Sequence, residues 1–122
     1  MPKYSAASKS RLVTCDPDLQ YLFNQIIKDV DCSILCGYRG EVEQTAAFNS
    51  GNSKLIYPKS YHNKIPSLAV DAAPYPIDWN DKERFIQFGG YVLGRASVYG
   101  IYIVWGGNWK TFKDYPHFQK GD

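Results

Sequence analysis

Seven patterned stretches follow one another along this chain, and their order restricts its fold more than any other feature of the sequence. Apolar residues at helical spacing, or runs of good helix formers, predict helices, and short β-forming or alternating runs predict strands. The expected helices span 17–29, 41–49 and 82–98, and the expected strands span 32–38, 67–73, 101–105 and 115–119. This order indicates a small α+β domain whose mostly antiparallel sheet is packed with helices.

The beginning of the chain carries fewer structural signals. Residues 1–15 contain only scattered apolar positions, so they are expected to form a loosely packed N-terminal arm held by Leu12 and Val13. Asp16 before Pro17 is typical of a capping residue followed by proline in the first turn of a helix. We therefore expect regular structure to begin at the first helix.

Length and composition limit the classes of function. The 122 residues fit a single domain over 1–122, and 44% apolar residues can build a core. A net charge of +2 is too small for binding dominated by phosphate neutralisation, so nucleic acid is not an expected partner. No apolar stretch is long enough to cross a membrane, and residues 1–5 lack the apolar run of a secretory signal peptide. We therefore expect synthesis in the cytoplasm without membrane insertion.

Cysteine and aromatic content give two further expectations. Three cysteines cannot all pair within one chain, which argues against a disulfide framework, so structural roles are expected for them. Aromatic residues make up 16% of the chain, which is more than a small core buries completely. Some of the aromatic rings are therefore expected to line a groove.

Two histidines and two aspartates carry the strongest chemical signal. His62 precedes Asp71 by nine positions, and Asp114 precedes His117 by three. Zinc accepts neutral imidazole and carboxylate ligands, and a catalytic zinc site uses three protein ligands with a fourth position left for water. Two histidines and one aspartate would fill such a site and leave the other aspartate as a general base. The spacing alone also fits ordinary turns, in which either aspartate caps nearby backbone amides.

Three short motifs resemble elements of the M15 zinc peptidases, which include D,D-carboxypeptidases and phage endolysins. S-Y-H-N at 60–63, P-S-L-A-V-D at 66–71 and D-Y-P-H-F at 114–118 are similar to the S-x-H, A-x-D and D-x-x-H-F elements of that family. The resemblance implies a Hedgehog-like or D,D-peptidase-like fold and a single M15-like catalytic domain.

Two further motifs resemble the phage endolysin branch of this family. They are G-Y-R-G-E at 37–41, followed by Gln44, and W-G-G-N-W at 105–109. Eight residues stand between His62 and Asp71, whereas most members of the family have six there. The three ligands can still bind one metal ion if the extra residues form a loop between them.

The resemblance implies roles for the residues that carry chemistry. Three zinc ligands are implied: His62, Asp71 and His117. Asp114 would act as the general acid and base. Arg39 would stabilise the oxyanion or orient the scissile carbonyl group, although its sequence context alone also fits a surface ion pair with a neighbouring glutamate.

Five residues are expected to shape the substrate site: Gln44, Ser60, Tyr75, Trp105 and Trp109. Ser60 lies in the first ligand motif, where it would shape the ligand loop or the substrate pocket. The aromatic rings could stack on sugars or on the stem peptide, but large aromatic residues also fill cores. Both possibilities stay open for each ring.

The resemblance implies a phage endolysin, a zinc-dependent peptidoglycan endopeptidase that hydrolyses the L-alanyl-D-glutamate bond of the stem peptide. It would have no separate cell-wall-binding domain, and we expect a monomer. It would be made in the host cytoplasm and act in the periplasm after a holin opens the inner membrane. Two alternatives stay open: a D,D- or L,D-carboxypeptidase of the same family, and a non-catalytic zinc-bearing phage module.

Overall fold

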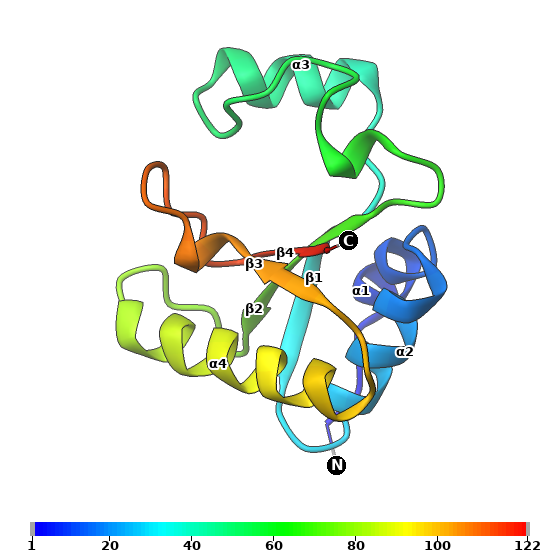
Figure 1. Ribbon diagram of the computed structural model, residues 1–122, viewed down its shortest axis with the longest axis vertical. Helices are drawn as coiled ribbons and strands as arrows, with labels where there is room; N and C mark the ends of the chain where they lie inside the picture. Colours follow the sequence, from blue (N-terminus) through cyan, green and yellow to red (C-terminus); the bar gives the residue numbers. More distant parts are fainter. Residues whose placement is uncertain (1, 122) are drawn as a thin grey trace.

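A four-stranded antiparallel sheet in the order β1-β2-β4-β3 forms the centre of the fold (Figure 1). The computed structural model describes residues 2–121. The helices are α1 (Ala6–Leu12), α2 (Pro17–Ile26), α3 (Glu41–Asn49) and α4 (Lys82–Val98), with two 3₁₀ turns, η1 (Tyr61–Asn63) and η2 (Gly106–Asn108). The strands are β1 (Cys32–Cys36), β2 (Ala69–Pro74), β3 (Ile103–Trp105) and β4 (His117–Lys120). The predicted α+β class and antiparallel sheet are confirmed.

The helices cover the two faces of the sheet unequally. α1 packs on β1, α4 packs on β2 and β3, and α2 contacts α4, so these three helices enclose the apolar core. In Figure 1, α3 lies on the opposite side of the sheet from α4. Within α3, only the side chain of Gln44 is buried. The sheet face toward α3 is therefore left free for polar side chains.

Alternation along β2 and β4 separates core side chains from polar ones. Val70, Ala72 and Phe118 are fully buried in the apolar core. Successive residues of a strand point to opposite faces, so Asp71 and His117 are directed to the other face of the sheet. The face that carries the chemical groups is thus fixed by the same pattern that builds the core.

Close packing of α4 against β3 depends on one glycine. A Cβ atom on Gly89 would lie 2.3 Å from Cε2 of Trp105, so only glycine lets this ring lie against the helix. Trp105 is 6% exposed, and its Nε1 donates a hydrogen bond to the Tyr115 carbonyl oxygen at 2.7 Å. The expectation that Trp105 contacts substrate is wrong, because its ring belongs to the core.

The N-terminal segment is a packed helix, which corrects the expected loose arm. Tyr4, Ser8 and Leu12 recur at intervals of four residues and are buried, and the Tyr4 hydroxyl donates to the Phe23 carbonyl oxygen at 2.7 Å. Two of these three side chains are polar, so a search for apolar periodicity overlooks the pattern. Val13, which was expected to hold the segment, is 65% exposed. Met1 lies outside the described residues.

Two of the three predicted helices have the bounds that the sequence predicts, whereas α2 ends at Ile26, three residues before its predicted end. α3 and α4 begin and end at the predicted residues, and Asp81 caps α4 by accepting a hydrogen bond from the Arg84 N–H at 3.2 Å. β3 is shorter than predicted because the Ile101 N–H donates to the Ala96 carbonyl oxygen, which ties that residue to the end of α4. In the described part of the chain, no helix has the length and apolar character needed to cross a membrane.

Candidate metal centre and active site

Two ligand candidates face each other across neighbouring strands. Asp71 on β2 and His117 on β4 are direct partners in the antiparallel register. The side chains of such partners project to the same face with Cβ atoms about 5 Å apart. Asp71 Oδ1 lies 3.2 Å from His117 Nδ1. The register of the sheet therefore builds this pair from residues that are 46 positions apart.

The third candidate, His62, reaches the sheet from η1. Ser60 caps this turn, because its Oγ accepts a hydrogen bond from the His62 N–H at 3.2 Å and the Asn63 side chain accepts one from the Ser60 N–H at 3.0 Å. His62 Nε2 lies 3.2 Å from Asp71 Oδ1, and His62 is 1% exposed. The three predicted metal ligands are thus brought together around one carboxylate oxygen.

Both rings are oriented by hydrogen bonds on their other nitrogen. His62 Nδ1 lies 2.8 Å from the Gly37 carbonyl oxygen, and His117 Nε2 lies 2.7 Å from Gln119 Oε1. These oxygens only accept, so the two nitrogens carry the hydrogens. When the rings are neutral, His62 Nε2 and His117 Nδ1 therefore direct lone pairs toward Asp71.

The lone pairs of these two nitrogens and the Asp71 carboxylate together favour a positive charge between them. Burial lowers the pKa of His62, but the Asp71 carboxylate outweighs burial and raises that pKa from 6.5 to about 10. Burial likewise raises the pKa of Asp71, but the charge of His62 outweighs burial and holds that pKa below its ordinary value. A cation stabilises this arrangement, and either a proton or a metal ion can supply the charge.

The donor set fits a zinc ion. Zinc bound tetrahedrally at about 2.0–2.1 Å to imidazole nitrogen and carboxylate oxygen sets neighbouring ligand atoms roughly 3.3 Å apart. Both histidine–aspartate distances here are 3.2 Å. A hydrogen bond on the second ring nitrogen is also the usual support of a metal-ligating histidine. The residue types and the two histidine–aspartate distances therefore fit a zinc site in which Asp71 is the ligand shared by the two histidines, which fall in separate groups of close ligand atoms.

Asp114 lies beside these ligand candidates. Ligand-type atoms of Asp71, Asp114 and His117 lie within 4.8 Å of one another, and so do those of Cys36, His62 and Asp71. Asp71 thus belongs to both groups. Burial raises the pKa of Asp114, and the nearby Asp71 carboxylate adds to this effect. A carboxyl group with a raised pKa beside a metal centre is suited to proton transfer.

Arg39 enters the site on a segment that is bonded to η1. Its N–H donates to the His62 carbonyl oxygen at 2.8 Å, and its Nε donates to Gln44 Oε1 at 2.8 Å. Gln44 is fully buried, and its Nε2 donates to Ser53 Oγ at 2.9 Å and to the Leu55 carbonyl oxygen at 2.6 Å. The expectation that Gln44 contacts substrate is wrong, because this side chain is internal and orients Arg39 instead.

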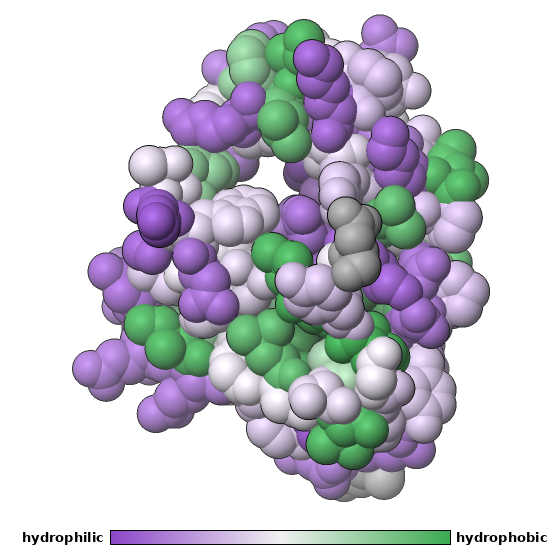
Figure 2. Space-filling model, in the orientation of Figure 1, coloured by the Kyte–Doolittle hydropathy of each residue, from purple (hydrophilic) through white to green (hydrophobic). Residues whose placement is uncertain are grey.

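A cavity of about 580 Å³ opens over these groups. Figure 2 shows the molecule hollowed between the part that carries α3 and the sheet, with hydrophilic residues on much of the rim. The predicted site residues that line the cavity are Arg39, Ser60, His62, Asp71, Trp109, Asp114 and His117. Trp79 and Phe112 also line it, so aromatic rings do line a groove, as their abundance predicts.

The predicted substrate-binding residues are distributed over different parts of the molecule. Trp109 lies in the cavity, with its ring centroid 5.0 Å from that of His117. Ser60 lines the cavity but is 4% exposed and serves as the cap of η1. Tyr75 is 55% exposed and lines a separate hollow beside Asp31. The structure therefore separates Tyr75 from the ligand candidates.

Several residues that orient the site were given no role in the sequence analysis. The Gly37 carbonyl and Gln119 fix the two histidine rings, and Asn63 Nδ2 donates to the Arg39 carbonyl oxygen at 2.8 Å. Cys36 approaches His62 and Asp71 because it is the register partner of Asp71 in β1. Only the H-F-Q ending of the last motif could have indicated Gln119, since the other contacts join segments that are distant in sequence.

Comparisons with known proteins identify the family of this chain. The chain matches the phage L-alanyl-D-glutamate peptidase family over residues 1–121. It is 30% identical to the peptidoglycan L-alanyl-D-glutamate endopeptidase CwlK of Bacillus subtilis, over 75% of this chain and 62% of CwlK, so it spans less than two thirds of that relative. The crystal structure of the L-Ala D-Glu endopeptidase ChiX of Serratia marcescens is similar, with a TM-score of 0.81 and 30% identity over 98% of this chain and 90% of ChiX. The chain therefore belongs to the phage L-alanyl-D-glutamate peptidase family.

Proposed function

We propose that this protein is a zinc-dependent endopeptidase that hydrolyses the L-alanyl-D-glutamate bond of peptidoglycan stem peptides. The observation that carries the proposal is the convergence of His62 and His117 on Asp71 inside an open cavity. The family match and the two relatives named as L-alanyl-D-glutamate endopeptidases support the choice of bond.

The residues of the site divide the reaction between them. His62, Asp71 and His117 would hold the zinc ion, which would supply a Lewis acid when bound. Asp114 accepts a proton from the attacking water and then donates it to the leaving amine. Its raised pKa makes the Asp114 carboxylate a stronger acceptor for that proton. Arg39, oriented by its hydrogen bond to Gln44, donates to the carbonyl oxygen as negative charge develops there.

The substrate lies along the cavity in this proposal. Trp109 offers an aromatic surface beside His117, on which a sugar ring or the stem peptide can stack. Ser60 acts indirectly, because its hydroxyl holds the turn that carries His62.

The family assignment favours a phage endolysin as the biological role. In that role the protein works as a monomer, is made in the host cytoplasm and reaches the wall after a holin opens the inner membrane. Purified protein should then lyse cells whose outer membrane has been permeabilised, and a chelator should abolish lysis. Lysis that is unaffected by a strong chelator would contradict the metal requirement.

Product analysis tests the scissile bond. Mass spectrometry of purified sacculi digested with the zinc-loaded protein should show fragments with a new amino terminus on D-glutamate. Release of free D-alanine without such fragments would indicate a carboxypeptidase instead.

A substitution at Asp114 tests the proton-transfer role. Asp114→Asn keeps the shape of the side chain but removes its basicity, so kcat should fall by about 10²–10⁴-fold. Zinc content, measured by elemental analysis, should stay at the wild-type level because Asp114 is not one of the three proposed ligands. Wild-type turnover in this variant would contradict the assignment of Asp114 as the proton-transfer group. Absence of turnover in the zinc-loaded wild-type protein would instead favour a non-catalytic module.

A further inference from the structure

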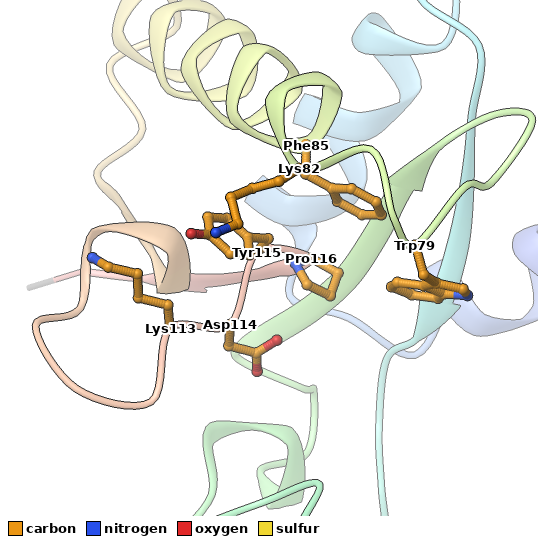
Figure 3. A pocket seen from close by; sticks show the side chains of 7 residues that line it. All are labelled: Trp79, Lys82, Phe85, Lys113, Asp114, Tyr115 and Pro116. Atoms are coloured by element: carbon orange, nitrogen blue, oxygen red, sulfur yellow. The ribbon is translucent and has the colours of Figure 1, made fainter.

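A second, smaller pocket adjoins the cavity on the side of Asp114. Its volume is about 270 Å³, and Figure 3 shows the side chains that line it. They are Trp79, Lys82, Phe85, Lys113, Asp114, Tyr115 and Pro116, and this group is named the Lys82 pocket below. Trp79, Asp114 and Pro116 also line the main cavity, so a substrate bound at Asp114 can extend into the Lys82 pocket.

The Lys82 pocket contains one ammonium group that has no hydrogen-bond partner within residues 2–121. Lys113 Nζ donates to the Trp109 carbonyl oxygen at 2.8 Å, and its side chain points away from the other lining residues in Figure 3. Lys82 is exposed and forms no ion pair or side-chain hydrogen bond with residues 2–121. Figure 3 shows it extending from the start of α4 toward Tyr115. Its charge is therefore available to a ligand.

Lys82 does not stabilise α4 at the position that it occupies in the helix. Lys82 is the first residue of α4, directly after the capping residue Asp81. The N-terminal end of a helix carries partial positive charge, so a cation in the first turn is unfavourable and an anion is favoured. Asp81 and Glu83, the neighbours of Lys82, are acidic but do not line the pocket, so Lys82 supplies the positive charge on this side of it.

The opposite wall of the pocket is aromatic. Trp79 stacks on Phe85 with ring centroids 5.3 Å apart and an interplanar angle of 16°. Trp79 is 63% exposed, so the face of this pair is open to a ligand. An apolar wall opposite an unpaired ammonium group fits a ligand that has a hydrocarbon stem and a carboxylate at its end.

We propose that the Lys82 pocket binds the free carboxylate of the glutamate residue that follows the scissile bond. This inference rests on the proposed function. Glutamate has two carboxyl groups, and only one of them continues the peptide, so the other stays ionised and unconsumed. The amine released by cleavage belongs to this same residue, and Asp114, which protonates that amine, also lines the pocket. The free carboxylate therefore lies within one residue length, about 3.5 Å, of the reacting atoms.

Two synthetic substrates test this specificity. One is a stem peptide with the free glutamate carboxylate, and the other carries the corresponding amide. The zinc-loaded wild-type protein should cleave the carboxylate substrate with kcat/KM about tenfold higher, since one charge-assisted hydrogen bond is lost with the amide. Lys82→Met should remove this preference, mainly by raising KM for the carboxylate substrate. Lys82→Arg should restore most of it.

Lys28→Met is the matched control, because it removes one exposed positive charge from the region after α2, away from the pocket. It should keep the wild-type preference for the carboxylate substrate. Equal cleavage of the two substrates by wild-type protein, or an unchanged preference in Lys82→Met, would overturn the assignment of the Lys82 pocket. Failure of the zinc-loaded wild-type protein to cleave either substrate would instead overturn the proposed function on which the inference rests.

Discussion

Each histidine of the site has one nitrogen engaged by an acceptor and one nitrogen directed at Asp71. The free nitrogen of His62 can bind a proton or a metal ion, but not both. The pKa of about 10 means that the metal-free protein keeps the proton on His62 across neutral pH. Metal binding at the proposed site must therefore displace it.

Proton release provides a direct test at the residue scale. Because the pKa of His62 is raised from 6.5 to about 10, zinc binding at pH 8 should release about one proton from His62. The apparent affinity should rise as pH increases and level off above pH 10. Titration calorimetry in buffers of different ionisation enthalpy measures the release, and the same binding heat in all buffers would contradict it.

The same shift predicts how the stability of the metal-free protein depends on pH. A folded-state pKa above the unfolded value stabilises the fold fully below about pH 6.5, and this contribution is lost as pH rises through about 10. Urea unfolding of chelated protein should therefore show a falling free energy of unfolding between these values. His62→Gln should flatten that part of the profile.

Gln44 is a positioning residue whose removal should affect both the fold and the reaction. Its side chain is fully buried and bonds Arg39, Ser53 and Leu55. Gln44→Leu leaves those groups without their partner, so unfolding should become easier by about 1–3 kcal/mol. At temperatures where the variant is folded, kcat should fall while zinc content is retained. Gln87→Leu, an exposed change on α4, should leave both unfolding and kcat near wild type.

At the scale of elements, α4 presents two adjacent glycines with opposite surroundings. A Cβ atom on Gly89 would lie 2.3 Å from the Trp105 ring, whereas one on Gly90 would meet nothing within 4 Å. Only Gly89 is therefore needed for the close packing of α4 on β3.

These neighbours form a matched pair for a stability measurement. Gly89→Ala should lower the free energy of unfolding by about 1–3 kcal/mol because the helix must move away from Trp105. Gly90→Ala should raise it by about 0.5–1 kcal/mol, since alanine loses less backbone entropy in a helix. Urea denaturation of both variants gives the comparison, and equal effects of the two substitutions would contradict this account of the packing.

Features that depend on local sequence were predicted, and features that depend on contacts between distant segments were missed. Caps and periodicity are local, so the bounds of α3 and α4 were predictable. The family motifs identified the histidines and aspartates that the structure brings together. The burial of Gln44 and Trp105 was not predictable, because each is enclosed by segments distant in sequence. Likewise, α1 was missed because polar side chains form part of its buried stripe.

At the scale of the whole molecule, the part that carries α3 has little core of its own. Gln44 is the buried residue of that helix, whereas the large apolar cluster lies on the other face of the sheet. Its connections to the remainder include the hydrogen bond from the Leu68 N–H to the Tyr61 carbonyl oxygen and the contact of His62 Nε2 with Asp71 Oδ1 at 3.2 Å. A metal ion held by His62 on this side and by residues of β2 and β4 would join the two parts.

Removal of the metal should therefore increase local unfolding more in some parts of the molecule than in others. Binding to the folded state alone stabilises it by about 4 kcal/mol at a free zinc concentration of 1,000 Kd. This stabilisation should protect η1 and α3 most, because His62 anchors that part to the sheet, while α4 is already held by the core. Hydrogen exchange with mass spectrometry, with and without chelator, should show faster exchange in 41–63 and little change in 82–98. If chelation accelerated exchange equally in both ranges, the ion would stabilise the fold as one unit and would not act as the link between its two parts.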